Sequence, residues 1–367
     1  MTTPIVGPRE QFDQRQQNHT RISLGELGEK AAAAWNSESV DPFRRIFYPL
    51  NRPQNVAMRS WLKVADGPLN PQRVEVRNPA KMSEIIKGVG KFLGASEVGI
   101  CELDPAYVYS HRGLRIDFYK GRAGTPITLT HRYAISILIE MDYPNFRNSP
   151  GFIDDAAVGK GYLETAKVAV SLAGYIRELG YPAKAHFHLE EEVLHIPIAV
   201  MAGLGELARN GSMITRKYGP RHRLATVTTD LPLAVDQPVD LGVQKLCRMC
   251  TKCAVSCPVQ AIPKENELPV IRGVQKWYLD NDACATYWTA NWKRWNSCAR
   301  CIAVCPWNRP WNRRQRLATW LVPRSKLARR LLLKLDDLLR GKRPNPQVEW
   351  LYYKQKGVKD AGLYVVE

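Results

Sequence analysis

The chain has 367 residues, 45% of them hydrophobic, so it is long enough to bury a sizeable core as one large domain or two. Its formal net charge of +18 indicates a surface that attracts an anionic partner: nucleic acid, acidic lipid or an acidic redox protein. The sequence has no apolar run long enough for a transmembrane helix. Its N-terminus has neither the apolar core of a signal peptide nor twin arginines, so we expect a cytoplasmic protein.

The first part of the chain predicts a polar segment followed by alternating helices and strands. Residues 1–80 are polar with short apolar patches, and we expect them to wrap over the core. Apolar residues recur at helical spacing over 82–93, and VGICELD (98–104) predicts the strand that follows. Residues 127–142 are rich in β-branched side chains and predict one or two strands, and 162–179 again show helical spacing.

A glycine-rich turn lies in the middle of the chain. HIPIAVM (195–201) predicts a strand, 202–211 a turn leading into a helix, and 224–230 another strand. The mixed order of these elements favours an α+β fold. Gly203 and Gly205 imitate a dinucleotide-binding fingerprint, but no acidic residue lies at the distance that a nicotinamide site requires. The alternatives are a turn that lets another large ligand approach the backbone, and one that lets two elements pack.

The last predicted element is a helix between Pro323 and Gly341, which mark its two ends. Its apolar stripe consists of Leu327, Leu331, Leu335 and Leu338. We favour a helix docked on the core with its basic side in solvent over a helix whose basic side contacts a membrane.

The cysteines form two ferredoxin-like runs. Cys247, Cys250, Cys253 and Cys257 precede a proline in the pattern C-x2-C-x2-C-x3-C-P, whose fourth cysteine binds the other cluster in two-cluster ferredoxins. A second, shorter run consists of Cys298, Cys301 and Cys305, with Cys284 upstream. We therefore predict two 4Fe–4S clusters, one on Cys247, Cys250, Cys253 and Cys305 and the other on Cys284, Cys298, Cys301 and Cys257.

Zinc is the alternative for these thiols. Structural zinc usually takes two short ligand pairs separated by a longer loop, which four thiols this crowded do not provide. Disulfides are disfavoured by the expected compartment. The ninth cysteine, Cys101, is interpreted as a small buried hydrophobic residue.

Residues 202–233, followed by CRMCTKCAVSCP and the shortened second run, resemble the cobalamin-dependent reductive dehalogenases. Residues 172–183 resemble the helix that precedes this stretch in the family, and the likeness spans residues 80–310. The related epoxyqueuosine reductases share the corrinoid core and the two clusters. The resemblance implies a nitroreductase-like α+β core that binds a base-off corrinoid, reduced through the clusters; no D-x-H-x-x-G motif is present.

The resemblance also implies a division of the chain. We expect an N-terminal wrapping segment at 1–80, a corrinoid-binding catalytic core at 81–240, a ferredoxin-like two-cluster unit at 241–320, and a C-terminal helix and tail at 321–367.

Three residues take catalytic roles by the same resemblance. Tyr162 corresponds to the tyrosine that donates a proton, Arg221 to the arginine that stabilises the phenolate, and His188 to a third polar contact, for which His186 is almost as good a choice. An ordinary core tyrosine and a structural histidine are the alternatives.

The corrinoid is expected to contact Gly203, Gly205, Gly211 and Arg223. The alternatives for Arg221 and Arg223 are that they bind a phosphate or amide arm of the corrinoid, or that they are charged surface residues without a role in the site.

The predicted function is reductive dehalogenation of a small organohalide, with an external electron donor such as ferredoxin or flavodoxin. The alternative is an epoxyqueuosine reductase, for which +18 would be a tRNA footprint. Gly161 stands where those enzymes carry an acidic proton donor, and the segment after Cys305 is short, so a nucleic-acid partner is not expected. A non-catalytic electron carrier is disfavoured by the long region upstream of the cysteines.

Overall fold

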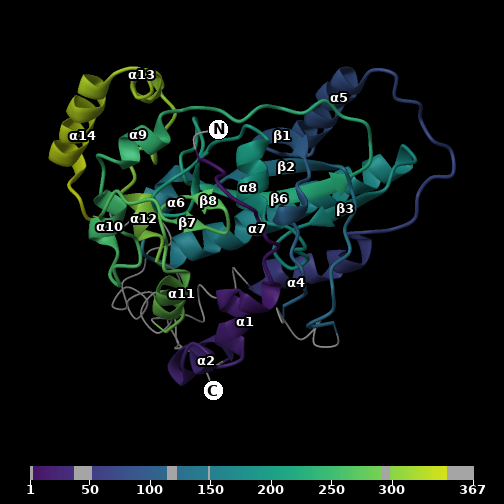
Figure 1. The fold of residues 1–367 in the computed structure, drawn as a ribbon, viewed down its shortest axis with the longest axis horizontal. Helices are drawn as coiled ribbons and strands as arrows, with labels where there is room; N and C mark the ends of the chain where they lie inside the picture. The colour runs from purple at the N-terminus through teal and green to yellow at the C-terminus, as the bar shows by residue number, and fades with distance from the viewer. Residues whose placement is uncertain (1–2, 37–51, 114–121, 148, 291–297, 345–367) are drawn as a thin grey trace, which may run out of the picture.

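A four-stranded antiparallel sheet forms the centre of the protein (Figure 1). The computed structural model describes residues 3–36, 52–113, 122–147, 149–290 and 298–344. The sheet has the order β1-β2-β6-β3, with β1 at Glu97–Glu102, β2 at Tyr133–Glu140, β3 at Ala183–His186 and β6 at His222–Thr229. A mixed α and β architecture is confirmed; the likeness to nitroreductases stays a prediction.

One long helix covers a face of this sheet. Helix α7, Phe152–Glu178, packs on β2, β3 and β6, and begins ten residues before the helix predicted at 162–179. Its small buried residues, including Ala166, Ala169 and Ala173, let the helix approach the strands closely. Helix α5, Pro79–Phe92, and helix α4, Arg52–Ser60, pack beside it. The predicted helix at 82–93 and the predicted strands at 98–104, 127–142 and 224–230 are therefore confirmed, whereas the short strand β3 was not predicted.

The strand predicted at 195–201 is wrong, because this segment is helix α8, His195–Met201. Pro197 lies in the first turn, where backbone N–H groups have no acceptor within the helix, so a proline there costs no hydrogen bond. Ile198 and Ala199 are fully buried against the sheet. The predicted helix at 202–211 is also wrong: the turn leads into β4, Glu206–Leu207, which pairs with β5, Met213–Ile214. A dinucleotide fingerprint needs a strand before the glycine-rich turn and a helix after it, whereas here a helix precedes the turn and a strand follows it. The structure therefore does not support a nicotinamide site at this turn.

The N-terminal segment packs on two parts of the molecule. Helix α1, Asn18–Ser23, and helix α2, Glu29–Asn36, contact α11, Asn281–Ala290, while α4 contacts α7. The remaining short elements are η1 Gln14–Gln16, η3 Trp61–Val64, η4 Pro105–Tyr107, α6 Tyr143–Arg147, α9 Val243–Cys247, α10 Lys252–Ser256, β7 Val270–Ile271, β8 Val274–Gln275 and α12 Arg300–Ala303.

The cysteine-rich region shares a hydrophobic core with the preceding residues. Ala208 and Ile214 belong to the same buried cluster as Leu246 and Trp307. Packing therefore crosses residue 240, where the resemblance placed a division.

Two helices follow the cysteine-rich region: α13, Arg313–Leu321, and α14, Lys326–Arg340. The predicted helix is confirmed, beginning after the N-cap Ser325 and ending before Gly341. The expectation that its leucine stripe docks on the core is wrong: Leu327, Leu331, Leu335 and Leu338 are all more than half exposed. Leu332 and Leu333 pack inward instead. Residues 345–367 of the predicted tail lie outside the described residues.

Within the described ranges, we find no helix with the length and apolar character needed to cross a membrane.

Gly99 in β1 marks a close approach between the sheet and α8. A Cβ atom at residue 99 would lie 2.3 Å from the carbonyl oxygen of Ala202, whereas one at Gly88 in α5 would meet nothing within 4 Å. We predict that Gly99→Ala lowers the free energy of unfolding by about 1–3 kcal/mol through overcrowding. Gly88→Ala, the matched control, should leave it unchanged or raise it by up to about 1 kcal/mol. Denaturant unfolding of both variants checks this, and equal midpoints would contradict the packing described.

Candidate functional site

The structure brings the eight clustered cysteines together in two sets. Three cysteines of the first run, Cys247, Cys250 and Cys253, line one small pocket together with Cys305 of the second run. Conversely, Cys257 of the first run interacts with Cys284, Cys298 and Cys301. The short helices α9, α10, α11 and α12 carry or flank these residues. Each set contains one cysteine of the other run, and Cys253 also interacts with Cys301 of the other set. The crossed ligand sets stay a prediction.

Burial makes these thiols poor anions on their own. It raises the pKa of Cys247 and of Cys301 to about 12, and that of Cys284 to about 11. A thiol with such a pKa stays protonated near neutral pH unless a cation stabilises the thiolate. Iron ions bound by the four thiols of each set would supply the stabilising cations. The chemistry of the two donor sets therefore fits two 4Fe–4S clusters.

Arg209 holds the loop of the first cysteine run, and sequence reasoning missed it. Its side chain is fully buried and donates to the carbonyl oxygens of Cys247 (2.8 Å) and Pro263 (2.9 Å) and to the Asn266 side chain (2.6 Å). Its guanidinium also lies 4.7 Å from the ring centroid of Trp277. No carboxylate pairs with Arg209 in the part of the chain that the structure describes, so its positive charge is left to face the cysteines. A lone arginine in a polar stretch gave no signal in the sequence.

Tyr162 on α7 contacts two of the predicted site residues. Its ring stacks on His188, with centroids 3.9 Å apart and planes 17° from parallel. The guanidinium of Arg223, at the start of β6, lies 4.9 Å from the same ring. An arginine this close to the face of an aromatic ring makes a cation–π contact, which holds Arg223 against Tyr162.

Arg221 is directed elsewhere. Its guanidinium lies 2.6 Å from Glu140 at the end of β2, donates to the carbonyl of Met141 at 2.7 Å, and lies 5.6 Å from the ring of Tyr143. A weaker bond of 3.5 Å reaches the carbonyl of Arg309, just after the second cysteine run. Arg223, not Arg221, therefore lies against Tyr162, and Arg221 ties the sheet to the cysteine-rich region.

His186 does not join Tyr162. It is fully buried in β3, and its Nε2 lies 2.9 Å from the hydroxyl of Thr228 on β6. Burial lowers the pKa of His186 well below its usual range, so the ring is neutral. Of the two histidines considered from the sequence, His188 is the one beside the tyrosine.

The glycines predicted to contact the corrinoid each have a packing reason. A Cβ on Gly203 would lie 2.6 Å from the carbonyl oxygen of Gln237, and one on Gly205 would lie 2.3 Å from that of Ile214. Gly211 has a φ of +74° and approaches the side chain of Leu279. Their contact with a cofactor stays a prediction.

The tyrosine site and the second set of cysteines share a wall. Met141 lies 3.4 Å from the Cβ position of Gly161, the residue before Tyr162. Met141 also belongs to the hydrophobic cluster that contains Ile302 and contacts Cys301. This small cluster therefore contacts both α7 beside Tyr162 and a cysteine of the second set.

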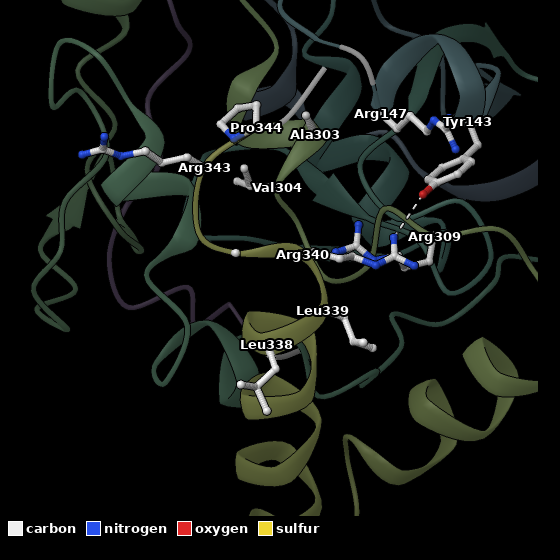
Figure 2. Close-up of a pocket in the computed structure, with 11 residues that line it drawn as sticks. Tyr143, Arg147, Ala303, Val304, Arg309, Leu338, Leu339, Arg340, Arg343 and Pro344 are labelled. Carbon is white, nitrogen blue, oxygen red and sulfur yellow. Dashed lines mark hydrogen bonds between the residues drawn. The ribbon is translucent and has the colours of Figure 1, made fainter. Parts of the chain in front are cut away.

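A pocket of about 380 Å³ opens beside α12 and was not predicted (Figure 2). Arg147, Arg309, Arg340 and Arg343 line it, and Tyr143 accepts a bond of 3.1 Å from Arg340. Tyr162 does not line this pocket, so it is separate from the tyrosine site.

Known proteins resemble this chain over most of its length. The family model for a 4Fe-4S dicluster domain matches residues 246–309. A tetrachloroethene reductive dehalogenase of Dehalobacter restrictus (strain DSM 9455 / PER-K23) is 36% identical over 285 residues, covering 66% of this chain and 51% of that protein. An epoxyqueuosine reductase of Aliivibrio fischeri (strain ATCC 700601 / ES114) is 24% identical over 262 residues, covering 63% and 68% respectively.

The solved structures include a catabolic reductive dehalogenase, NpRdhA, in complex with 3-bromo-4-hydroxybenzoic acid. It has a TM-score of 0.84 and 29% sequence identity to this chain. The match covers 93% of this chain and 48% of the solved chain. The chain thus spans about half the length of the dehalogenases that it matches. Its two cysteine runs, its fold and its sequence agree: the chain belongs to the reductive dehalogenase family, with the epoxyqueuosine reductases as more distant relatives.

Proposed function

We propose that the protein is a corrinoid-dependent reductive dehalogenase that replaces a halide on a small organohalide with hydrogen. Two electrons and one proton convert the carbon–halogen bond to a carbon–hydrogen bond and release halide. The observation that carries the proposal is the position of Tyr162. It lies against Arg223 and His188, and the Met141 cluster connects its helix to Cys301. Membership of the family supports the reaction class.

The residues around Tyr162 suit a large polar cofactor. The Nε atom of Arg223 is buried and has no hydrogen-bond partner among the described residues, so a donor remains for a bound group. A corrinoid bound here would supply a strongly reducing cobalt centre that activates the carbon–halogen bond. Arg223 is the residue best placed to hold one of its polar arms or to face the substrate.

Tyr162 would give the proton. Its phenolic O–H would donate its proton to the carbon from which halide leaves, and the positive charge of Arg223 would stabilise the phenolate that remains. His188 stacks on the ring and fixes its orientation. Arg223 thus takes the supporting role that the sequence assigned to Arg221, which is engaged by Glu140.

The two sets of cysteines would bring the electrons one at a time. The set containing Cys301 contacts the wall of the tyrosine site, so its cluster would pass electrons to the cofactor. The set containing Cys305 would receive them first. An external donor such as ferredoxin or flavodoxin would supply them, and the basic surface fits an acidic protein of this kind.

An epoxyqueuosine reductase activity on tRNA is less well supported. A Cβ atom at Gly161, where those relatives carry an acid, would lie 2.9 Å from Cγ of Arg223. The arginine therefore occupies the space that an acidic side chain would need.

The metal content tests the cofactor set. We expect protein produced anaerobically with a corrinoid supplied to contain about eight irons and one cobalt per chain, as two 4Fe–4S clusters and one corrinoid require. Elemental analysis measures both. Iron without cobalt, under conditions that load a known corrinoid protein, would remove the proposed mechanism.

Tyr162→Phe tests the proton donor. We expect the variant to retain both metals and to lose dehalogenation by about 10²–10⁴-fold, because general acid catalysis is worth this much. Halide release from a panel of aryl and alkenyl halides, with an artificial low-potential donor, is the measurement. Tyr175→Phe, on the same helix, is the matched control and should keep full activity. Full activity in Tyr162→Phe would end the assignment.

Cys301→Ser tests the crossed ligand sets. The variant should lose the iron of one cluster, leaving about four irons per chain, and should retain the signal of the other cluster in electron paramagnetic resonance. Cys101→Ala removes the one cysteine outside the two sets, which is buried between β1 and α8, and should leave the iron content unchanged. Unaltered iron in Cys301→Ser would refute the sets.

A further inference from the structure

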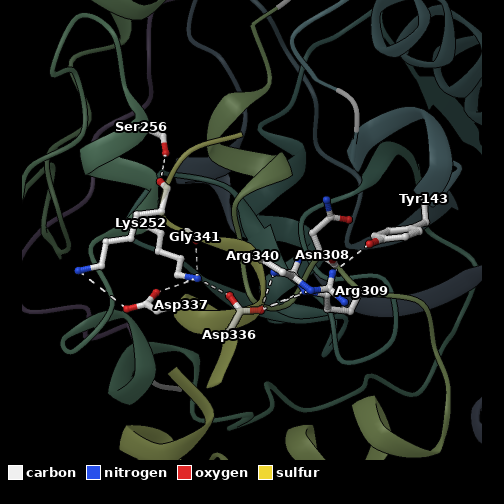
Figure 3. Close-up of polar contacts among 10 residues, drawn as sticks. Tyr143, Lys252, Ser256, Asn308, Arg309, Asp336, Asp337, Arg340 and Gly341 are labelled. Atoms are coloured by element: carbon white, nitrogen blue, oxygen red, sulfur yellow. Dashed lines mark hydrogen bonds and ion pairs between the residues drawn. The ribbon is translucent and has the colours of Figure 1, made fainter. Parts of the chain in front are cut away.

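Helix α14 is attached to the rest of the protein by the ion pairs of Asp336 and Asp337, beside the partly buried Leu332 and Leu333 (Figure 3). Asp336 forms an ion pair with Lys252, and Asp337 lies 2.9 Å from the same ammonium group, which is only 3% exposed. Arg309 reaches Asp336 at 2.6 Å, and Lys252 donates to the carbonyl of Gly341 at 3.0 Å. A buried ion pair with several partners holds its position firmly, since loss of one partner would leave a buried charge.

This attachment turns the apolar side of α14 toward solvent. Together with the exposed apolar residues of α13, it forms a surface that we call the leucine face. Its members are Leu317, Trp320, Leu327, Leu331, Leu335, Leu338 and Leu339, each at least half exposed. An amphipathic helix normally buries its apolar side, so this orientation indicates that something else covers the leucine face.

Exposed basic residues alternate in sequence with the members of the leucine face along α13 and α14. The exposed ones are Arg313, Arg314, Arg316, Arg324, Lys326, Arg330, Lys334 and Arg340. Among ion pairs of residues that the structure describes, Arg340 alone of this set takes part, with Asp336 at 4.0 Å. The guanidinium of Arg324 lies 4.5 Å from the ring centroid of Trp320. This places a cation beside the one member of the leucine face whose side chain also has a polar N–H group.

We propose that the leucine face binds the surface of an anionic lipid bilayer. Leucines and a tryptophan flanked by lysines and arginines are the composition of helices that lie in the membrane interface. The leucines would enter the acyl boundary, while the cations would meet lipid phosphates. This inference rests on the surface of α13 and α14 alone and does not depend on the proposed reaction.

A second copy of the chain fits the leucine face poorly. A twofold interface brings the same patch of both copies together, so the flanking cations would face their own equivalents. Such like-charge contacts oppose association. A uniformly negative surface has no such penalty and uses cations on both sides of the leucines.

Binding to vesicles tests the proposal on the protein with its cofactors bound. We expect co-sedimentation with vesicles of equal parts phosphatidylcholine and phosphatidylglycerol, weakening with salt, and little binding to phosphatidylcholine alone. The double variant Leu331→Asp, Leu335→Asp should bind at least roughly tenfold more weakly, since each leucine loses its apolar burial. The double variant Arg330→Gln, Lys334→Gln should lose about fivefold for each charge removed.

The control variant is Phe92→Asp, which places a charge on a residue that is 88% exposed at the end of α5, away from α13 and α14 in Figure 1. It should bind vesicles as the parent does. Absence of binding by the parent, or equal binding by the leucine double variant, would overturn the proposal. So would a dimer in sedimentation that the leucine substitutions dissociate, or a lower melting temperature of that variant without lipid, because these outcomes assign the face to a second copy or to this chain itself.

Discussion

The exchange of one cysteine between the two runs is the constraint on which the rest of the structure depends. Cys257 joins the set formed by the second run, and Cys305 joins that of the first. The two segments must therefore pack against each other, and the loop between them has to fold back. Arg209 holds the first run in place by binding carbonyls on both sides of it, those of Cys247 and Pro263. The hydrophobic cluster around Trp307 then joins the cysteine-rich region to the preceding residues Ala208 and Ile214.

The tyrosine site inherits its position from this packing. Two arginines separated by a single residue face different tasks because the chain enters strand β6 between them. Arg221, before the strand, binds Glu140 and reaches the carbonyl of Arg309, while Arg223, within it, lies against Tyr162. One arginine thus secures the junction between sheet and cysteines, and the other supplies charge at the site. Met141 lies between the two regions, so a change in either one reaches the other through direct contact.

Helix α14 shows that a hydrophobic stripe does not by itself decide which side of a helix is buried. Its leucines would favour burial by about 1.5–3 kcal/mol each if a surface were available to receive them. The neighbouring surface instead offers Lys252 and Arg309, and two aspartates of the helix satisfy these buried cations. A buried cation left without its partner is strongly destabilising, and this orientation pairs both Lys252 and Arg309 with the aspartates of the helix.

The sequence by itself determined the features that depend on local spacing. The two cysteine runs, the helices at 82–93 and 162–179 and the central strands follow from ligand spacing and hydrophobic periodicity, which neighbouring residues define. Only the tertiary structure decided what depends on distant partners. HIPIAVM is a helix because the sheet receives its apolar residues, Arg223 rather than Arg221 lies against the tyrosine because Glu140 engages the other, and α14 faces outward because of Lys252. In each case, a side chain has several possible partners that are distant in the sequence. The local sequence pattern does not determine which of these contacts has the most favourable free energy.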